Sequence, residues 1–523
     1  MKRLVAPASG LLLLGVSALP AQVLTTRPRA DVSAAVHHDV SPPLRDIKPL
    51  PALFLAEHEK PRPIPVPHGD ALAAERGDGA LQAPSNVLVQ ATIGSNFDGL
   101  GIGSPYTPDA APPDTNGAVS GTQYVQWVNE AFAVFDKSSG AIVYGPAAGN
   151  TLWSGFGGPC QSFNDGDPIV QYDKLANRWI FTQFAVSSTP YTQCVAVSKT
   201  SDATGQYYRY SFSYGSTFND YPKLGVWPDA YYVTYNMFTS RFQGARLCAW
   251  DRAKMLTGAA ATQQCFQLSS SFGGVLPSDV DGTTAPPAGR PNYMVNFGSS
   301  RLNLWKFHVD FATPANTTLT GPTAITVASF TAACGGGTCV AQKSTNRKLD
   351  SLADRLMYRL AYRNFGDHEA LVVNHSVKVS GNNQNQVVGV RWYELRNPNG
   401  TPQVFQQGTY SPDSNSRWMG SVAMDKQGNM AMGYSVSSSS VFPSVRYTGR
   451  LATDPVNTMQ AESPIYDGTG SQTGGLSRWG DYSAIAVDPS DDCTFWFTTE
   501  YLKTTGSFNW STRISSVKFP GCQ

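Results

Sequence analysis

Apolar and polar residues alternate in short runs along most of the chain, and residues that favour turns separate the runs. Residues 124–129 and 131–136 are two such runs, and the turn Asp-Lys-Ser-Ser-Gly ends the second of them. Period-two alternation between turns of this kind is typical of antiparallel strands joined as meanders. Helical periodicity is nearly absent after residue 86. The pattern therefore predicts an all-β domain over residues 86–523.

The strand pattern recurs as a larger unit from about residue 112 onward. Each unit begins with a polar loop, continues into a small or apolar strand, and reaches an aromatic-rich strand after a turn. Seven units begin near these residues: Asp114, Asp165, Asp220, Asp279, Arg355, Arg417 and Arg478. Their spacing is slightly above the ~50 residues of the longest common propeller repeat. We therefore predict a seven-bladed β-propeller, with six or eight blades as alternatives, because radial repetition leaves only short strand edges. Residues 86–92 form one more strand, which we expect to close the ring against the last blade.

The first 85 residues have a different composition from the rest. A positive start, an apolar stretch that includes residues 11–14, and small residues up to Ala21 predict a secretory signal peptide over residues 1–21. Its apolar core is shorter than the ~20 residues that cross a bilayer. Residues 22–85 contain many prolines and few aromatic residues, which predicts a flexible leader. The alternative is a pro-segment that masks the site.

The chain has 8 cysteines, an even number, which in an exported protein favours disulfides over metal sites. Pairing neighbours in order gives four short loops: Cys160 with Cys194, Cys248 with Cys265, Cys334 with Cys339, and Cys493 with Cys522. Spacing alone does not fix this connectivity.

The charge balance excludes two classes of partner. A formal net charge of +1, with 15% charged residues, does not provide the basic face that nucleic acid requires. No segment after the signal peptide is long and apolar enough to span a membrane. We therefore expect a secreted protein, extracellular or periplasmic, that is a monomer.

The last third of the chain carries a resemblance. Residues 417–425, with the sequence Arg-Trp-Met-Gly-Ser-Val-Ala-Met-Asp, and residues 446–450 and 478–496 resemble a group of secreted bacterial proteins. That group is usually assigned to the sialidase-like (BNR-type) β-propeller superfamily and is mostly of uncharacterised function. The resemblance covers roughly residues 110–520. It implies a propeller fold and leaves the activity open, because this fold hosts many unrelated sites.

The loops that lead into the innermost strands hold the candidate site. If the ring closes, their polar side chains converge on one central funnel. The candidate catalytic residues are Asp114, Asp165, Asp167, Asp220, Tyr221, Arg417, Arg478, Asp481 and Tyr482. The competing interpretation is that each Asp only shapes its own turn.

Carboxylates crowded together with arginines suit general acid–base chemistry, because neighbouring charges move their pKa values apart. A pair of carboxylates serves glycoside hydrolysis. A polysaccharide lyase needs a base and a cation, for which His368 and His375 are further candidates. We predict a carbohydrate-active enzyme, hydrolase or lyase, that acts on a polysaccharide or glycoconjugate. The alternative is a non-catalytic propeller that binds glycan or protein at the cell surface.

No cofactor is required for this chemistry. Asp165-Gly-Asp167 and Asp279-Val-Asp281 resemble parts of calcium loops, so calcium binding is an alternative to plain turns. The sialidase turn motif is not intact, and the turns that begin at Asp136 and Asp425 only partly match it. We expect those turns to be structural and to lie on the face opposite the site.

Overall fold

The computed structural model describes residue 1 and residues 28–52, 62–66, 77–103, 106–108, 110–382 and 385–523. Strands dominate the described residues, which confirms the predicted all-β class. The helices are short: η1 (Leu44–Asp46), η2 (Gly149–Trp153), α2 (Gly158–Ser162), α3 (Arg252–Met255), η3 (Pro314–Asn316) and η4 (Ala333–Gly336). Apart from residue 1, the predicted signal peptide lies outside the described residues.

Consecutive strands pair into antiparallel sheets, as the alternation predicts. Two sheets hold four consecutive strands each. The first is β4 (Asn116–Val119), β5 (Gln123–Val128), β6 (Ala131–Asp136) and β7 (Ile142–Ala148). The second is β26 (Ser416–Met424), β27 (Met430–Ser437), β28 (Ser444–Arg450) and β29 (Ser463–Tyr466).

Two further sheets add a strand from the N-terminal region to four consecutive strands. One is β8 (Ile169–Asp173), β9 (Arg178–Ala185), β10 (Tyr191–Ser198) and β11 (Tyr207–Gly215), with β2 (His37–Val40) at its edge. The other is β12 (Phe218–Val226), β13 (Tyr231–Phe238), β14 (Phe242–Trp250) and β15 (Thr262–Gln267), with β1 (Asp31–Ala34) at its edge.

The largest sheet is two four-stranded meanders joined by parallel pairing of β16 with β22. Its strands are β16 (Leu276–Val280), β17 (Asn292–Gly298), β18 (Arg301–His308), β19 (Thr318–Thr326), β22 (Met357–Asn364), β23 (Glu369–Asn382), β24 (Asn385–Arg396) and β25 (Gln403–Tyr410). A small hairpin lies between the two meanders in sequence: β20 (Thr338–Val340) and β21 (Leu349–Asp350).

The last sheet joins the two ends of the domain. It contains β30 (Ala484–Val487), β31 (Thr494–Leu502), β32 (Trp510–Lys518) and β3 (Thr92–Asp98). An N-terminal strand therefore pairs with the last meander, as predicted, but it is β3, which shares only Thr92 with residues 86–92. The preceding residues are engaged elsewhere, because the N–H of Val89 donates to the carbonyl of Ala461 at 2.9 Å.

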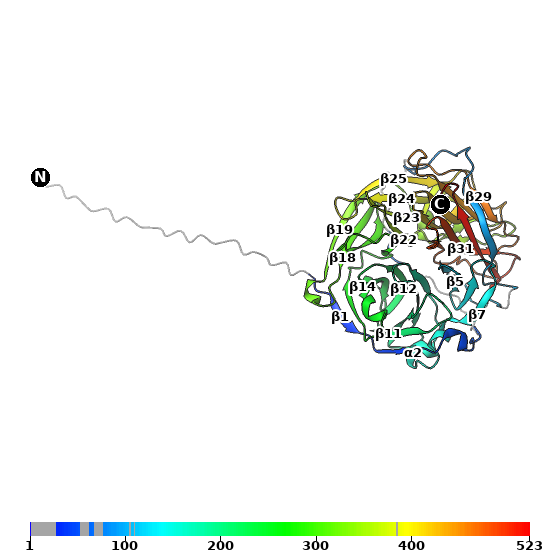
Figure 1. Cartoon of the computed structure of the whole chain (residues 1–523). Coiled ribbons are helices and arrows are strands. Elements are labelled where there is room, and N and C mark those ends of the chain that lie inside the picture. The colour runs from blue at the N-terminus through cyan, green and yellow to red at the C-terminus, as the bar shows by residue number, and fades with distance from the viewer. Residues whose placement is uncertain (2–27, 53–61, 67–76, 104–105, 109, 383–384) are drawn as a thin grey trace.

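The first strand of each meander contacts the first strand of the next, and the series returns to its start. The contacting strands, in order, are β4, β8, β12, β16, β22, β26, β30 and again β4. Figure 1 shows the sheets arranged around a centre, with β12 and β22 nearer the middle and β7, β19 and β25 toward the rim. The ring therefore closes, which is the condition for the polar loops to converge.

Large aromatic side chains fill the spaces between the sheets. Nine tryptophans are among the largest fully buried side chains: Trp127, Trp153, Trp179, Trp227, Trp250, Trp305, Trp392, Trp418 and Trp479. Most tryptophans thus belong to the core, as the composition suggests, and burial of this much apolar area stabilises the ring.

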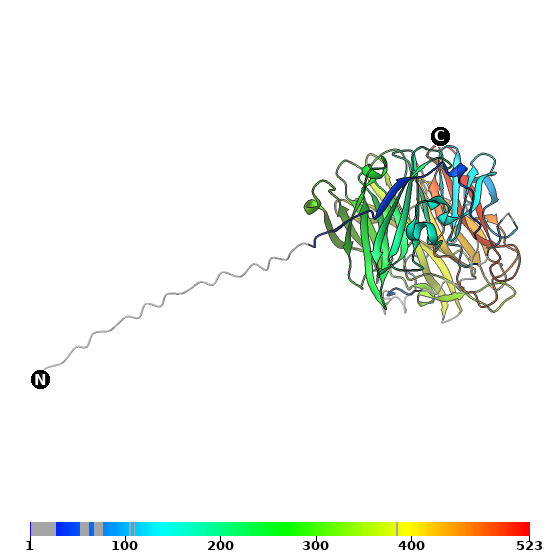
Figure 2. The same cartoon turned by 90° about the horizontal axis from the view of Figure 1, so that it is seen from below.

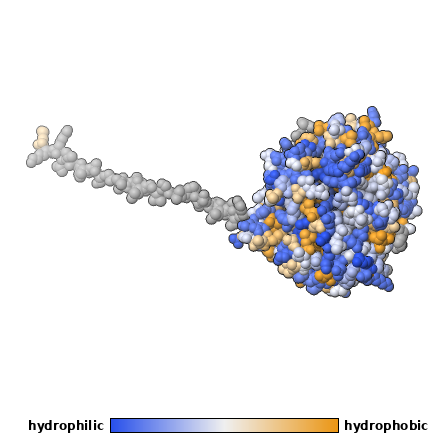
Figure 3. All heavy atoms as spheres, viewed as in Figure 1, coloured by the Kyte–Doolittle hydropathy of each residue, from blue (hydrophilic) through white to orange (hydrophobic). Residues whose placement is uncertain are grey.

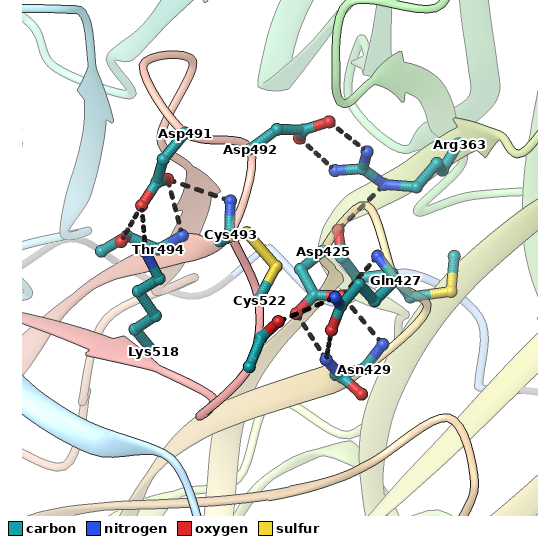
Figure 4. The surroundings of a disulfide bond; sticks show 12 residues. Arg363, Asp425, Gln427, Asn429, Asp491, Asp492, Cys493, Thr494, Lys518 and Cys522 are labelled. Atoms are coloured by element: carbon teal, nitrogen blue, oxygen red, sulfur yellow. Dashed lines mark hydrogen bonds and ion pairs between the residues drawn. A yellow bond between two sulfur atoms is a disulfide. The ribbon is translucent and has the colours of Figure 1, made fainter.

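The four disulfides pair neighbouring cysteines in order. Cys493–Cys522 ties the start of β31 to the C-terminal end (Figure 4). Asp425 accepts N–H donors from Gln427 and Asn429 of its own turn, each at 2.9 Å. The Asp425 turn is therefore structural, as expected.

The described parts of residues 22–85 are held against the ring, which differs from the flexible leader that we expected. β1 pairs with β15 and β2 pairs with β11, along the outer side of the ring (Figure 2). Asp39 binds the buried Arg209 at 2.6 Å, and Asp78 binds the buried Arg391 at 2.5 Å. We inferred flexibility because this region has few apolar residues. Its backbone pairing and its ion pairs with buried arginines hold it to the ring instead.

Hydrophilic residues cover most of the face shown in Figure 3, and the hydrophobic residues on it form separate small patches. Among the described residues, no helix is long and apolar enough to cross a membrane.

Candidate functional site

The loops before the first strands hold one another by carboxylate side chains. Asp114 accepts the N–H of Asp481 at 2.7 Å, and Asp167 accepts the N–H of Tyr221 at 3.0 Å. These bonds bring together segments that are far apart in sequence: the loops before β4 and β30, and the loop before β8 with β12. We call this end of the ring the mouth and define it by Asp114, Asp167, Tyr221 and Asp481.

The backbone at the mouth adopts a conformation that side chains disfavour. The φ angles of Asp114, Asp167 and Tyr221 are 45°, 47° and 55°. Asp tolerates the left-handed region because its side chain bonds locally, whereas a bulky Tyr there is strained. Such strain is retained where the surrounding contacts fix the backbone, and it is common at functional sites.

Two tyrosine rings and a buried lysine fill the centre of the mouth. The Nζ of Lys223 lies 3.4 Å from the ring centre of Tyr221 and 4.0 Å from that of Tyr482. The guanidinium of Arg355 lies 4.4 Å from the Tyr221 ring centre. The hydroxyl of Tyr482 donates to the carbonyl of Pro168 at 2.9 Å. Cation–π contacts of this kind are strong where water is excluded.

Burial sets the charge states in this centre. Burial lowers the pKa of Lys223 to about 7, against the opposing effect of Asp167 and Asp114. Burial also raises the pKa of the Tyr221 hydroxyl, which therefore stays protonated at neutral pH. The carboxylate of Glu500 is buried without a hydrogen-bond partner among the described residues. Burial, together with Asp114, raises the pKa of Glu500 well above its usual value.

Two cavities lie at the mouth, and a third adjoins one of them. The first, the acidic cavity, has a volume of about 400 Å³, and its lining includes Glu130, Asp165, Asp167, Phe184, Phe218 and Asp220. The second, the middle cavity, has a volume of about 330 Å³, and its lining includes Asp220, Asp354, Arg355, Arg478 and Asp481. The third, the basic cavity, has a volume of about 490 Å³, and its lining includes Thr338, Arg347, Lys348, Thr473 and Ser477.

Shared lining residues show that the acidic cavity neighbours the middle cavity and that the middle cavity neighbours the basic cavity, and we call this series of three cavities the groove. Asp220 and Arg62 line both the acidic and the middle cavity. Thr338 lines both the middle and the basic cavity. The groove therefore runs from carboxylates at one end, past Asp220, to Arg347 and Lys348 at the other.

Two arginines of the middle cavity are paired with carboxylates. Arg355 donates two hydrogen bonds to Asp354, at 2.7 and 3.0 Å, and Arg478 binds Asp481. In the basic cavity, by contrast, Arg347 and Lys348 have no carboxylate partner among the described residues. Positive charge is therefore least compensated at that end of the groove.

Most predicted site residues reach the mouth. Asp114, Asp167, Tyr221 and Tyr482 hold its loops and centre, and these residues line its cavities: Asp165, Asp167, Asp220, Arg478 and Asp481. Asp165 also shapes a loop, because it accepts the N–H of Ser187 at 2.7 Å.

Arg417 has another environment. Its guanidinium binds Asp413 and Glu462, each at 2.7 Å, in the segments that precede β26 and β29. It thus stabilises the sheet of β26 to β29 instead of facing the cluster around Lys223. An arginine that opens an inner strand is ambiguous in sequence, since side chains of a strand alternate between two faces.

The histidine candidates also lie elsewhere. His375 is fully buried, and its Nε2 lies 2.9 Å from the hydroxyl oxygen of Tyr393. His368 pairs with Asp367, whose side chain is 83% exposed. Neither histidine lines the acidic, middle or basic cavity.

The structure gives the Asp-x-Asp loops no metal cluster. Among the described residues, no group of three or more His, Cys, Asp or Glu side chains is arranged to hold a metal ion. Asp279 binds Arg359 at 2.9 Å, and Asp281 binds Lys174 at the same distance. Protein cations thus occupy the carboxylates of the second loop, whereas Asp165 and Asp167 accept the backbone N–H groups of Ser187 and Tyr221.

Sequence reasoning missed Lys223, Arg355, Glu130 and Glu500. Lys223 stands two residues after Tyr221 and is therefore close to that candidate in sequence. That spacing was the available signal for Lys223. Glu500 lies in a second strand, and its approach to Asp114 depends on how neighbouring sheets pack.

No protein-family model and no curated protein matches the chain. Solved structures with a partly similar fold include the N-terminal domain of Nup159, at 9% identity and TM-score 0.36, covering 84% of this chain and 100% of that one. Another is the neuraminidase-like protein of subtype N10 from A/little yellow-shouldered bat/Guatemala/060/2010, at 7% identity and TM-score 0.34, covering 72% and 99%. A third is the α-L-arabinofuranosidase Arb93A from Fusarium graminearum, at 8% identity and TM-score 0.33, covering 85% and 98%. These values assign the chain to none of their families.

Proposed function

We propose that the chain is a secreted seven-bladed β-propeller that binds an anionic polysaccharide or glycoconjugate across its mouth and cleaves it, as a glycoside hydrolase or a polysaccharide lyase. One observation carries the proposal: three neighbouring cavities form a groove with carboxylates at one end and, at the other, two cations that have no carboxylate partner in the described part of the chain. The seven first strands that contact one another in a closed series support the blade number. Relationship to the sialidase-like superfamily remains a prediction from sequence.

The shape of the groove suits a chain of sugars. Several cavities in a row accommodate successive units of a polymer, whereas a small ligand needs only one. Phe184, Tyr191 and Phe218 line the acidic cavity and offer ring faces on which sugar rings stack. Carboxylates beside them accept hydrogen bonds from sugar hydroxyls.

The charge of the groove favours an anionic sugar. Arg347 is exposed and Lys348 is half-buried, and both line the basic cavity without a carboxylate partner among the described residues. A carboxylate or sulfate group on the substrate would supply the missing negative charge. The hydroxyls of Thr338, Thr473 and Ser477 add hydrogen-bonding groups.

Asp220 is the residue to which we assign proton transfer. Asp220 is partly exposed and lines both the acidic and the middle cavity. A substrate that occupies both cavities therefore has a bond beside Asp220. Arg355 is close enough for Asp220 to influence its pKa. We assign positioning roles to Asp114 and Asp167, because both are buried and accept backbone N–H groups.

A second candidate function is binding without cleavage. It is favoured by the burial of Asp114, Asp167, Tyr221 and Tyr482, which leaves few carboxylates within reach of a substrate. In that case the groove holds the glycan, and Asp220 serves as a hydrogen-bond acceptor.

The test is a screen of the purified protein against neutral, uronate-containing and sulfated polysaccharides. Release of reducing ends reports cleavage, ultraviolet absorbance of unsaturated products separates lyase from hydrolase, and affinity electrophoresis reports binding. We expect cleavage of at least one anionic polymer. Binding without products would establish the second candidate, and absence of both would refute the assignment of the groove to glycans.

A further inference from the structure

A short segment of the N-terminal region, residues 62–66, lies in the mouth. Arg62, Pro63, Ile64 and Val66 all line the middle cavity, and Arg62 also lines the acidic cavity. The chain thus places one of its own segments at the junction of two cavities, beside Asp220.

Apolar side chains of the segment fit against glycines of the ring. Ile64 is only 4% exposed, and its Cδ1 would be 3.2 Å from a Cβ added to Gly274. The Cγ2 of Val66 would be 3.0 Å from a Cβ added to Gly336. Larger residues at these two glycines would therefore crowd the segment. The segment and the ring are therefore closely packed at these two points.

Arg62 provides the charged contact. Its guanidinium lies 4.1 Å from the ring centre of Phe218 and 5.9 Å from that of Phe238. Phe218 belongs to the acidic cavity, where Asp220 gives negative charge. A cation on an aromatic face next to a carboxylate is held by both.

The segment is suited to binding in an extended form. Pro63 and Pro65 restrict the backbone φ angle and thereby reduce the entropy lost on binding. Proline-rich segments are recognised in this way by aromatic-lined grooves. Ion pairs of Asp39 with Arg209 and of Asp78 with Arg391 hold the chain to the ring on both sides of the segment. This raises its effective concentration at the mouth.

We propose that the mouth is a binding site for an extended peptide of the type Arg-Pro-Ile-Pro-Val, and that residues 62–66 are its built-in ligand, which competes with the glycan. Departure of the segment joins the acidic and middle cavities into one cleft with Asp220 at its centre. The peptide site stands on its own contacts, and only the competition rests on the proposed function.

The first test needs no glycan. A full-length variant has residues 62–66 replaced by Gly-Ser-Gly-Ser-Gly, and isothermal titration measures its binding of the peptide Arg-Pro-Ile-Pro-Val. We expect the variant to bind the peptide at least about tenfold more tightly than the wild-type chain, whose own segment occupies the site. Peptides with Arg62→Ala or Ile64→Asp, and a scrambled peptide, should bind at least about tenfold more weakly.

Equal binding of the peptide to both proteins, or binding to neither, would overturn the peptide site, provided that the variant unfolds at the same denaturant concentration as the wild type.

The second test uses the polysaccharide found by the screen. The Gly-Ser variant should bind it with a dissociation constant about tenfold lower, and added peptide should reverse the gain. An unchanged constant would overturn the competition. If the protein binds the peptide but binds no polysaccharide, only the glycan function is refuted.

Discussion

The amine of Lys223 lies 3.4 Å from the ring centre of Tyr221, and both side chains are buried at the mouth of the ring. Burial lowers the pKa of this lysine to about 7, from an ordinary value of 10.5. The lysine therefore changes its charge near neutral pH, inside a cluster that includes Asp167 and Arg355. Buried lysines are among the groups whose pKa shifts most readily.

Stability should depend on pH through Lys223. Between pH 7 and 10 the unfolded chain keeps the proton that the folded chain has released, so the free energy of unfolding contributed by this group rises with pH in that window. Below pH 7 both states are charged and the contribution is constant. Compared with Lys223→Met, the wild type should gain up to about 1.4 kcal/mol per pH unit across the window. Urea unfolding of both proteins at several pH values measures this, and parallel curves would contradict it.

Replacement of Asp220 by asparagine should abolish cleavage while the fold is kept. Loss of a group that transfers protons costs about 10²- to 10⁴-fold in rate. The matched control is Asp367→Asn, because Asp367 is exposed and pairs with His368. Initial rates and circular dichroism of both variants provide the test. Full activity of Asp220→Asn would remove this residue from the mechanism.

The basic cavity should determine the preference for anionic glycans. The double variant Arg347→Ala and Lys348→Ala should bind an anionic polymer about tenfold more weakly and show a smaller dependence on salt. Its affinity for a neutral polymer should not change. Lys426→Ala, an exposed lysine in the Asp425 turn, is the control. Equal losses for anionic and neutral polymers would show that the cavity does not recognise charge.

The attachment of the N-terminal region should contribute to stability. Asp39→Ala removes the partner of Arg209, whose side chain is 2% exposed, and should lower the free energy of unfolding by about 2 kcal/mol. Asp31→Ala breaks the pair with Arg246, in which the Asp31 side chain is 68% exposed, and should change stability by less than about 1 kcal/mol. Denaturant unfolding compares them, and equal effects would contradict the role given to burial.

Strand alternation predicted the elements well. The two faces of a strand have different surroundings, and the alternation of residue types along the sequence reflects that difference. Residues 124–129 and 131–136 were expected as strands, and β5 and β6 cover nearly the same positions. The pairing of Cys493 with Cys522 follows the order of the cysteines along the chain, although their spacing alone did not fix it. The ring, by contrast, depends on contacts between sheets, for which the repeated unit was only indirect evidence.

The site was predictable where a loop residue marks the start of a unit, as Asp114, Asp167 and Asp481 do. Its centre was only partly predictable: Lys223 follows Tyr221 by two residues in β12, whereas Arg355 becomes a neighbour of Tyr221 only through packing between different sheets. Arg417 was misplaced because the sequence does not tell which face of β26 its side chain occupies. The bound N-terminal region was missed because its buried residues, such as Leu44 and Ile64, are too far apart to form a pattern.

The pairing of β3 with β32 has a consequence for how the chain reaches its native state. Arg513 donates to the side chain of Asn96 at 2.6 Å, across 417 residues of sequence. The final sheet therefore cannot assemble until the ribosome has delivered nearly the whole polypeptide. Contacts of such high sequence separation make folding slow, and early meanders must persist with open edges meanwhile. A chain cut short before residue 510 would leave β3 without its partner, so a premature stop late in translation should be as damaging as an early one.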